Sequence, residues 1–268
     1  MSTPPTKQPI TGWQRDLVIR IDKGVYWFSK HWLAVFNFVL ALYVGLPVLA
    51  PVLMNAGAAS PANIIYAMYK PMCHQMATRS FFLFGEQYAY PRNIAPTDLQ
   101  PIEAYTPTLP EYAGVDPNNW VDYYLLAGRE FRGNAQMGYK MALCERDMSM
   151  YSFLLVGGLL YAMLRKRIRI RPLPFLLFIL IGLGPIALDG FSQLFGYYAT
   201  PIDGSTATGF LAQMQRIFPL RESTPMLRSA TGALFGFMLA WLAYPQIDGG
   251  MKATEHDLHA KLSRIGEL

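Results

Sequence analysis

Four long apolar stretches alternate with polar segments along the chain. The first, residues 32–55, contains no Asp, Glu, Lys or Arg, and single charges interrupt the third at Asp189 and the fourth at Arg228. About 20 apolar residues in a helix cross a hydrocarbon core about 30 Å thick. We therefore predict an all-α membrane protein with four transmembrane helices. The predicted spans are about residues 32–54, 148–164, 172–198 and 224–245.

Basic residues indicate the orientation of these spans. Several Lys and Arg residues precede the first span, and residues 165–171, between the second and third spans, read RKRIRIR. Short loops rich in Lys and Arg remain in the cytoplasm. We therefore predict cytoplasmic N and C termini, with residues 56–147 and 199–223 outside. The protein is expected to be a multi-pass protein of the cell (plasma) membrane, with the lipid bilayer as a partner.

The composition agrees with this class and excludes others. Apolar residues make up 52% of the chain, charged residues 15%, and the net charge is +5. Because most of this positive charge lies in the predicted cytoplasmic segments, it gives no reason to expect a nucleic-acid partner. The chain has no phosphate-binding loop, nucleophile elbow, haem motif or two-carboxylate metal motif. The composition therefore does not indicate an enzyme class.

The polar segments divide the chain into parts. Residues 1–30 are predicted to be a cytoplasmic amphipathic segment, residues 31–245 a four-helix membrane domain, and residues 246–268 a cytoplasmic tail. Residues 88–136, rich in proline and tyrosine, lack helical periodicity and are predicted to form an irregular extracytoplasmic cap. Its many aromatic residues need a surface to bury against. That surface would be the outer face of the bundle or a partner membrane protein.

Two cysteines on the predicted outer side suggest a metal or thiol site. If a helix begins near residue 144, Cys144 and Asp147 share one face, and a thiolate with a carboxylate forms half of a zinc-type site. Cys73 would supply a third ligand. His74 diverges from its neighbour and is assigned a role as a base or as a hydrogen-bond partner of a ligand. A Cys73–Cys144 disulfide and two unrelated free thiols remain open alternatives.

Charged residues in the spans suggest a pocket at the same membrane face. Asp189 and Arg228 lie at matching depths near the outer edge, which predicts a charge pair. The pair would either fix helix packing or bind a substrate or an ion. Arginines on this face would pair with Asp147 or Asp189, or bind lipid phosphate. The predicted pocket and ion-pair residues are Arg79, Arg146, Asp189, Gln193, Arg221 and Arg228.

Four ordered motifs carry a resemblance to a known family. They occupy Cys73–Gln87, Met141–Asp147, Asp189–Gly196 and Leu220–Gly232, and over about residues 60–245 the chain resembles the DUF2085 family of predicted membrane proteins. In that family the second motif often reads Cys-x-Arg-Cys, whereas this chain has Asp147 in the last position. The insertion at residues 88–136 is a second departure. The resemblance implies a shared metal or redox site and no established activity.

The leading hypothesis is a metal-binding or thiol-based membrane protein that acts on a lipid-linked or exoplasmic substrate. A zinc-like divalent metal would be its cofactor, and no other cofactor is expected. The competing hypothesis is a non-catalytic subunit of a larger membrane complex, with a disulfide and a cap that binds a partner. A transporter is a weaker third option, because four spans with one buried charge pair offer little for alternating access.

Overall fold

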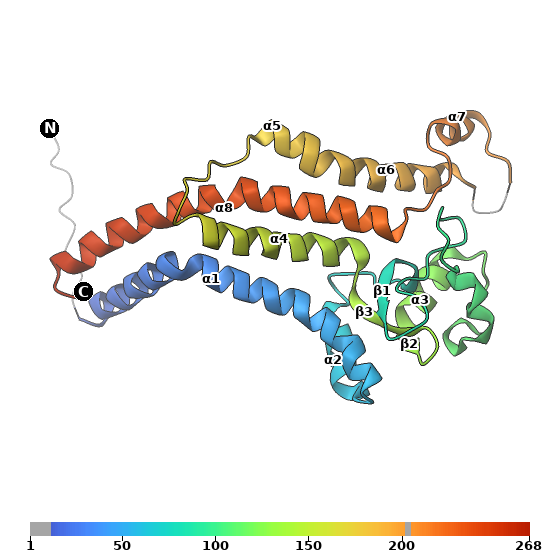
Figure 1. Ribbon diagram of the computed structural model, residues 1–268, viewed down its shortest axis with the longest axis horizontal. Coiled ribbons are helices and arrows are strands. Elements are labelled where there is room, and N and C mark those ends of the chain that lie inside the picture. The colour runs from blue at the N-terminus through green and yellow to red at the C-terminus, as the bar shows by residue number, and fades with distance from the viewer. Residues whose placement is uncertain (1–11, 202–204) are drawn as a thin grey trace.

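Four long helices run side by side in the computed structural model, which describes residues 12–201 and 205–268 (Figure 1). Each of these helices is long and apolar enough to cross a membrane. The prediction of four membrane-spanning helices is therefore confirmed. They are α1 (Trp13–Asn55), α4 (Glu145–Leu164), the continuous stack of α5 (Phe175–Leu177), η6 (Phe178–Leu183) and α6 (Gly184–Ala199), and α8 (Pro225–Arg264).

Helices α1 and α8 are about twice as long as a membrane is thick. Their 43 and 40 residues correspond to about 65 and 60 Å at a rise of 1.5 Å per residue. Helix α1 therefore continues without a break through residue 30, where the sequence changes from polar to apolar. Helix α8 likewise continues through residue 246, where the sequence changes from apolar to polar. The amphipathic segment predicted at residues 1–30 is the first part of α1, except for residues 1–11, which lie outside the described residues.

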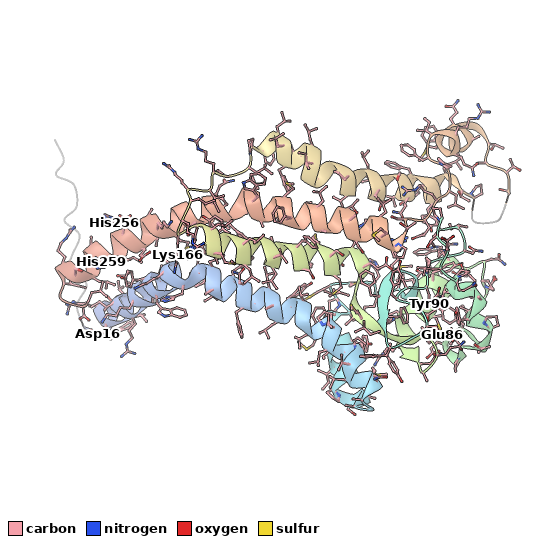
Figure 2. The ribbon with its side chains drawn as sticks, in the orientation of Figure 1. Asp16, Glu86, Tyr90, Lys166, His256 and His259 are labelled. Atoms are coloured by element: carbon pink, nitrogen blue, oxygen red, sulfur yellow. The ribbon has the colours of Figure 1, made fainter. Side chains whose placement is uncertain are left out.

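The two extensions contact each other beyond the bundle. Lys23 pairs with Glu267 at 2.8 Å, and Lys261 pairs with Asp22 at 2.6 Å. Figure 2 shows His256 and His259 on this end of α8, at the opposite end of the molecule from Glu86 and Tyr90 in the cap, which in the structure comprises residues 73–144 rather than only the predicted 88–136. Such contacts between polar faces explain why both helices continue past their apolar stretches.

Small residues let α4 and α8 pack closely. A side chain at Gly236 would collide with the backbone carbonyl of Met150, and one at Gly232 would collide with the carbonyl of Arg146. Close backbone contact of this kind replaces the hydrophobic effect between helices in lipid. The packing brings the first turns of α4 and α8, and the charged residues on them, within contact distance.

The segments between the spans also fold as expected in part. Helix α2 (Ala59–Tyr69) connects the end of α1 to the segment that holds Cys73. Helix α7 (Gly209–Ile217) lies between α6 and α8. The side chain of Thr224 accepts a hydrogen bond from the amide of Leu227 and caps α8, which explains where that helix begins.

The cap contains a small sheet that the all-α prediction lacks. Strand β3 (Gly138–Cys144) pairs in antiparallel fashion with β1 (Ser80–Leu83) on one side and β2 (Gly133–Asn134) on the other. Ser80 lies opposite Cys144 in this register. The rest of the cap consists of short helices: η1 (Ala77–Arg79), η2 (Ile102–Ala104), η3 (Thr106–Thr108), η4 (Pro110–Tyr112), η5 (Val121–Ala127) and α3 (Gly128–Glu130).

The aromatic residues of the cap form a core of their own. Tyr90 and Phe131 are fully buried, and Phe82 packs edge-on against Tyr90 with ring centroids 4.9 Å apart. Tyr112 and Tyr123 form a second edge-on pair at 5.0 Å. The expectation that these side chains bury against the bundle or a partner is therefore wrong for most of them. They bury against one another, and this aromatic core stabilises an insertion with little regular structure.

A buried lysine ties the cap together. Lys140 in β3 is fully buried, and its ammonium donates hydrogen bonds to the carbonyls of Gln75, Gly128 and Arg129 at 2.7, 2.7 and 2.8 Å. Burial lowers the pKa of Lys140 to about 7, whereas three carbonyl acceptors match the three donors of the charged form. Lys140 thereby connects the turn that follows Cys73 to helix α3, which contains Gly128 and Arg129.

Candidate metal centre and ion-pair cavity

The structure brings Cys73, Cys144 and Asp147 together at the junction of cap and bundle. Cys144 is the last residue of β3 and precedes α4, and Asp147 lies in the first turn of that helix. The Cys144 thiol donates to Asp147 Oδ2 at 3.0 Å. One ligand atom from each of the three residues lies within 4.8 Å of the others. These are the three residues that the sequence suggested as metal ligands.

The two cysteines are free thiols and form no disulfide. When Cys73 ionises, the single proton of the Cys144 thiol turns from Asp147 to the Cys73 sulfur. This interaction lowers the pKa of Cys73 to about 7 and raises the pKa of Cys144 above its ordinary value. The lowered pKa favours the thiolate form of Cys73 relative to an ordinary cysteine. A thiolate, rather than a thiol, is the metal ligand and the nucleophile.

Gln75 shapes the turn that presents Cys73. It adopts a left-handed backbone conformation, φ 53°, which is costly for a residue other than glycine. Its side-chain amide donates to the carbonyls of Tyr66 at 2.9 Å and Ala142 at 3.1 Å, and its backbone amide donates to Cys73 Sγ at 3.4 Å. These hydrogen bonds hold the strained turn and orient the Cys73 sulfur. The sequence analysis missed Gln75, although it lies inside the first motif.

His74 points away from the cluster. Its side chain is exposed while that of Cys73 is buried, and its carbonyl accepts a hydrogen bond from Arg129 Nε at 3.0 Å. The divergence of adjacent side chains that the sequence analysis expected is therefore present. The structure supplies no contact between the His74 imidazole and the three candidate ligands.

One ion-pair network surrounds Arg228. Its guanidinium lies 3.0 Å from Glu145 and also pairs with Glu222, which Arg79 contacts at 2.9 Å. Both carboxylates are fully buried. The predicted pair between Asp189 and Arg228 is therefore wrong. Matching depth in the membrane does not decide which faces of two helices meet, and α8 turns Arg228 toward α4.

A second network surrounds Asp189. The carboxylate pairs with Arg146 and, at 2.8 Å, with Arg221. Gln193 donates to the Asp189 carbonyl at 2.9 Å, and its side-chain oxygen accepts from the backbone amide of Ser223 at 3.1 Å. The predicted pocket residues thus belong to two adjacent networks, each with its own carboxylates.

Besides Gln75, four residues of the ion-pair networks and the cavity were missed from the sequence. Glu145 and Glu222 lie beside predicted residues in their motifs, and the excess of arginine over Asp189 was a signal that more carboxylates must be buried nearby. Tyr197 donates to Glu222, and Arg92 in the cap donates to the Tyr197 hydroxyl at 2.5 Å. Arg92 lies in the insertion, where no periodicity indicated its position.

A cavity of about 850 Å³ adjoins both networks and the cysteine cluster. Cys144 and Asp147 line it, whereas Cys73 lies behind them. The other lining residues come from three parts of the molecule. The cap contributes Arg79, Arg92, Asn118, Trp120 and Val121, and the helices of the bundle contribute Arg146, Gly190, Gln193, Leu194, Tyr197, Tyr198 and Arg228. The segment between α6 and α8 contributes Thr200, Pro201 and Leu220.

Comparison with known proteins supports the membrane assignment. The model of the family described as "Predicted membrane protein (DUF2085)" matches residues 130–242, which confirms the resemblance over that stretch. The uncharacterized protein MJ1492 of Methanocaldococcus jannaschii is 25% identical over 222 residues, which cover 81% of this chain and 92% of the relative. No solved structure matches this chain. The match and the four apolar helices identify a multi-pass membrane protein.

Proposed function

We propose that this membrane protein holds a zinc-like divalent metal at the extracytoplasmic end of its helix bundle, with Cys73, Cys144 and Asp147 as ligands. The observation that carries the proposal is the convergence of two free thiols and a carboxylate, from the turn after α2 and from the β3–α4 junction, within 4.8 Å. Ligands in a tetrahedral zinc site are separated by about 3.5–3.8 Å, given metal–ligand distances near 2.0–2.3 Å. Small side-chain movements bring the three groups to these separations.

The site resembles catalytic rather than structural zinc sites in its number of ligands. Structural sites use four protein ligands, whereas catalytic sites use three and leave a position open. Cys144 and Asp147 line the cavity, so an open position there would be accessible to a substrate. A bound divalent ion would polarise a substrate oxygen or activate water. A lipid-linked or exoplasmic substrate fits a cavity at this end of the bundle.

The exposed imidazole of His74 remains outside the ligand set in this proposal. It lies next to Cys73 in the chain but faces solvent. A role as a base would require the His74 side chain to reach the cavity, so we assign it none in metal binding.

The competing interpretation, a non-catalytic subunit of a larger complex, has less support. The cap uses most of its aromatic residues in its own core, which removes the main reason to expect a partner there. The cysteines are free, so no disulfide serves as a structural link.

Elemental analysis of the purified protein in detergent tests the proposal. We expect about one equivalent of zinc or another divalent transition metal per chain, and its loss in Asp147→Ala and Cys144→Ala. Asp98→Ala, which removes an exposed carboxylate from the cap, is the matched control and should retain the metal.

A thiol count under denaturing, non-reducing conditions completes the test. Two free thiols are expected with the metal bound. A metal-free protein in which both thiols are consumed in a disulfide would contradict the proposal and favour the structural subunit.

A further inference from the structure

The cavity beside the cysteine cluster is lined by arginines that come from three different segments. Arg79 follows the cysteine turn, Arg92 belongs to the cap, and Arg146 lies in the first turn of α4. Their guanidinium groups therefore approach the cavity from separate directions. Two of them retain unused donors: Nη1 of Arg79 and Nη1 of Arg146 have no acceptor in the parts of the chain that the structure describes.

Arg92 is a cation without a carboxylate partner among residues 12–201 and 205–268. Its guanidinium lies 4.0 Å from the ring centroid of Tyr124 and donates to the hydroxyl of Tyr197 at 2.5 Å. Both partners are neutral phenols. Removing a charge from water without an opposite charge is costly. Arg79, Arg146 and Arg228 each have a carboxylate partner. Among the described residues, Arg92 is therefore the arginine of the cavity that has no anionic partner.

The remainder of the cavity wall is apolar. Val121, Leu194 and Leu220 line it and are substantially exposed, as is Tyr198. Leu194 and Tyr198 belong to α6, part of a helix long and apolar enough to cross a membrane, so that in a bilayer their exposed side chains would face lipid chains. A ligand that fits both parts of the wall has an anionic head and an apolar chain.

We propose that this cavity binds the phosphate head group of a lipid. Arginine matches phosphate geometry, and the three terminal oxygens of a phosphate monoester can accept from three guanidinium groups at once, whereas a carboxylate has two oxygens. The inference deepens the proposed function, on which its role as substrate rests, because Cys144 and Asp147 line the same cavity. It names a phosphate-bearing amphiphile as the substrate class.

A binding titration on the full-length protein in neutral detergent tests this inference. Three probes separate the contributions: hexadecyl phosphate carries head and chain, hexadecanol carries the chain alone, and inorganic phosphate carries the head alone. We expect hexadecyl phosphate to bind about ten-fold or more tightly than either of the others. Equal binding of hexadecyl phosphate and hexadecanol would overturn the inference. Equal binding of hexadecyl phosphate and inorganic phosphate would show a phosphate site without lipid specificity, and would overturn the lipid assignment.

Arg92→Gln is the decisive variant, because it removes the cation without leaving a carboxylate unpaired. The affinity of Arg92→Gln for hexadecyl phosphate should be about ten-fold lower than that of the unmodified protein. The affinity of Arg92→Lys should lie between these two values. Arg216→Gln removes an exposed arginine from α7, outside the cavity, and should change nothing. An Arg92→Gln protein that folds and binds as tightly as Arg216→Gln would overturn the inference. If Arg92→Gln fails to fold, Arg92→Lys decides by the same criterion.

Metal content, measured on the same preparations, separates this inference from the proposed function. Arg92→Gln should retain its metal, and Cys144→Ala should lose it. Tight, Arg92-dependent binding of hexadecyl phosphate to a protein that holds no metal would defeat the metal proposal and leave the lipid-phosphate site standing. A metal-loaded protein that binds hexadecyl phosphate no more tightly than hexadecanol would overturn the lipid-phosphate site and leave the metal proposal standing.

Discussion

The bundle and the cap each bury a cation, and they neutralise it by different means. Arg228 in the bundle lies between two fully buried carboxylates, Glu145 and Glu222. Lys140 in the cap lies among three backbone carbonyls. The helices of the bundle use most of their backbone carbonyls internally, and the carbonyl that Arg228 reaches, that of Thr78 at 3.3 Å, belongs to the cap. The cap is largely irregular, so its carbonyls are free to act as acceptors.

This difference also separates the consequences of removing each cation. Without Arg228, charged side chains from α4 and from the segment before α8 lose their partner. Without Lys140, three backbone carbonyls of the cap lose a hydrogen-bond donor, and no charged group is left unpaired. The first loss should therefore be larger and should affect the whole bundle, and the second should be smaller and local.

The largest expected effect follows from Arg228→Met. The change leaves Glu145 unpaired, and Glu222 keeps only Arg79 and Tyr197. Breaking a buried pair by removing one partner costs about 3–5 kcal/mol. Thermal unfolding in detergent should show a clear fall in melting temperature, while Arg216→Met, on the exposed face of α7, should show none. A melting temperature equal to that of the control would contradict the role assigned to this network.

Lys140→Met should have the next largest effect. It fills a similar volume and leaves three carbonyls without their donor, for which we expect a cost of roughly 2–4 kcal/mol. Hydrogen exchange should increase in the turn at residues 73–79 and in residues 127–131, with the bundle helices unchanged. Lys166→Met, at an exposed position after the end of α4, is the matched control. Exchange that increases equally throughout α4 and α8 would show that the cap and the bundle are not separable in this way.

The smallest expected effect concerns protonation at the junction of the two regions. The hydrogen bond from Cys144 lowers the pKa of Cys73 from 9.0 to about 7. The thiolate fraction should therefore rise through pH 7, and the rate of alkylation of Cys73 by a small reagent in metal-free protein should rise with it. In Cys144→Ala the donor is lost, so the midpoint should move to higher pH. An unchanged midpoint would mean that the two thiols do not interact.

Much of the candidate metal site followed from local sequence. Cys144 and Asp147 are three positions apart, at the N-cap and in the first turn of α4, and the structure confirms their contact at 3.0 Å. The role of Gln75 did not follow in the same way. Its left-handed backbone is held by hydrogen bonds to Tyr66, nine residues earlier, and to Ala142, 67 residues later.

The ion-pair partners could not be predicted from depth alone. The sequence analysis placed Asp189 and Arg228 at matching depths, yet each meets other charges. Depth follows from counting residues along one helix. The choice of partner depends on how each helix is rotated about its axis, which is decided by contacts such as that of Gly232 with the backbone of α4.

The sequence by itself determined the membrane class, the four spans and the three candidate ligands. The spans depend on hydrophobicity and the Cys144–Asp147 pair on helical spacing, which neighbouring residues encode, and Cys73 joined the set because the predicted topology puts both cysteines on one side. Only the tertiary structure decided the aromatic core of the cap, the burial of Lys140 and Glu222, and the arginine-lined cavity. These depend on contacts between residues far apart in the chain. A polar residue becomes buried only when another segment covers it and supplies its hydrogen bonds.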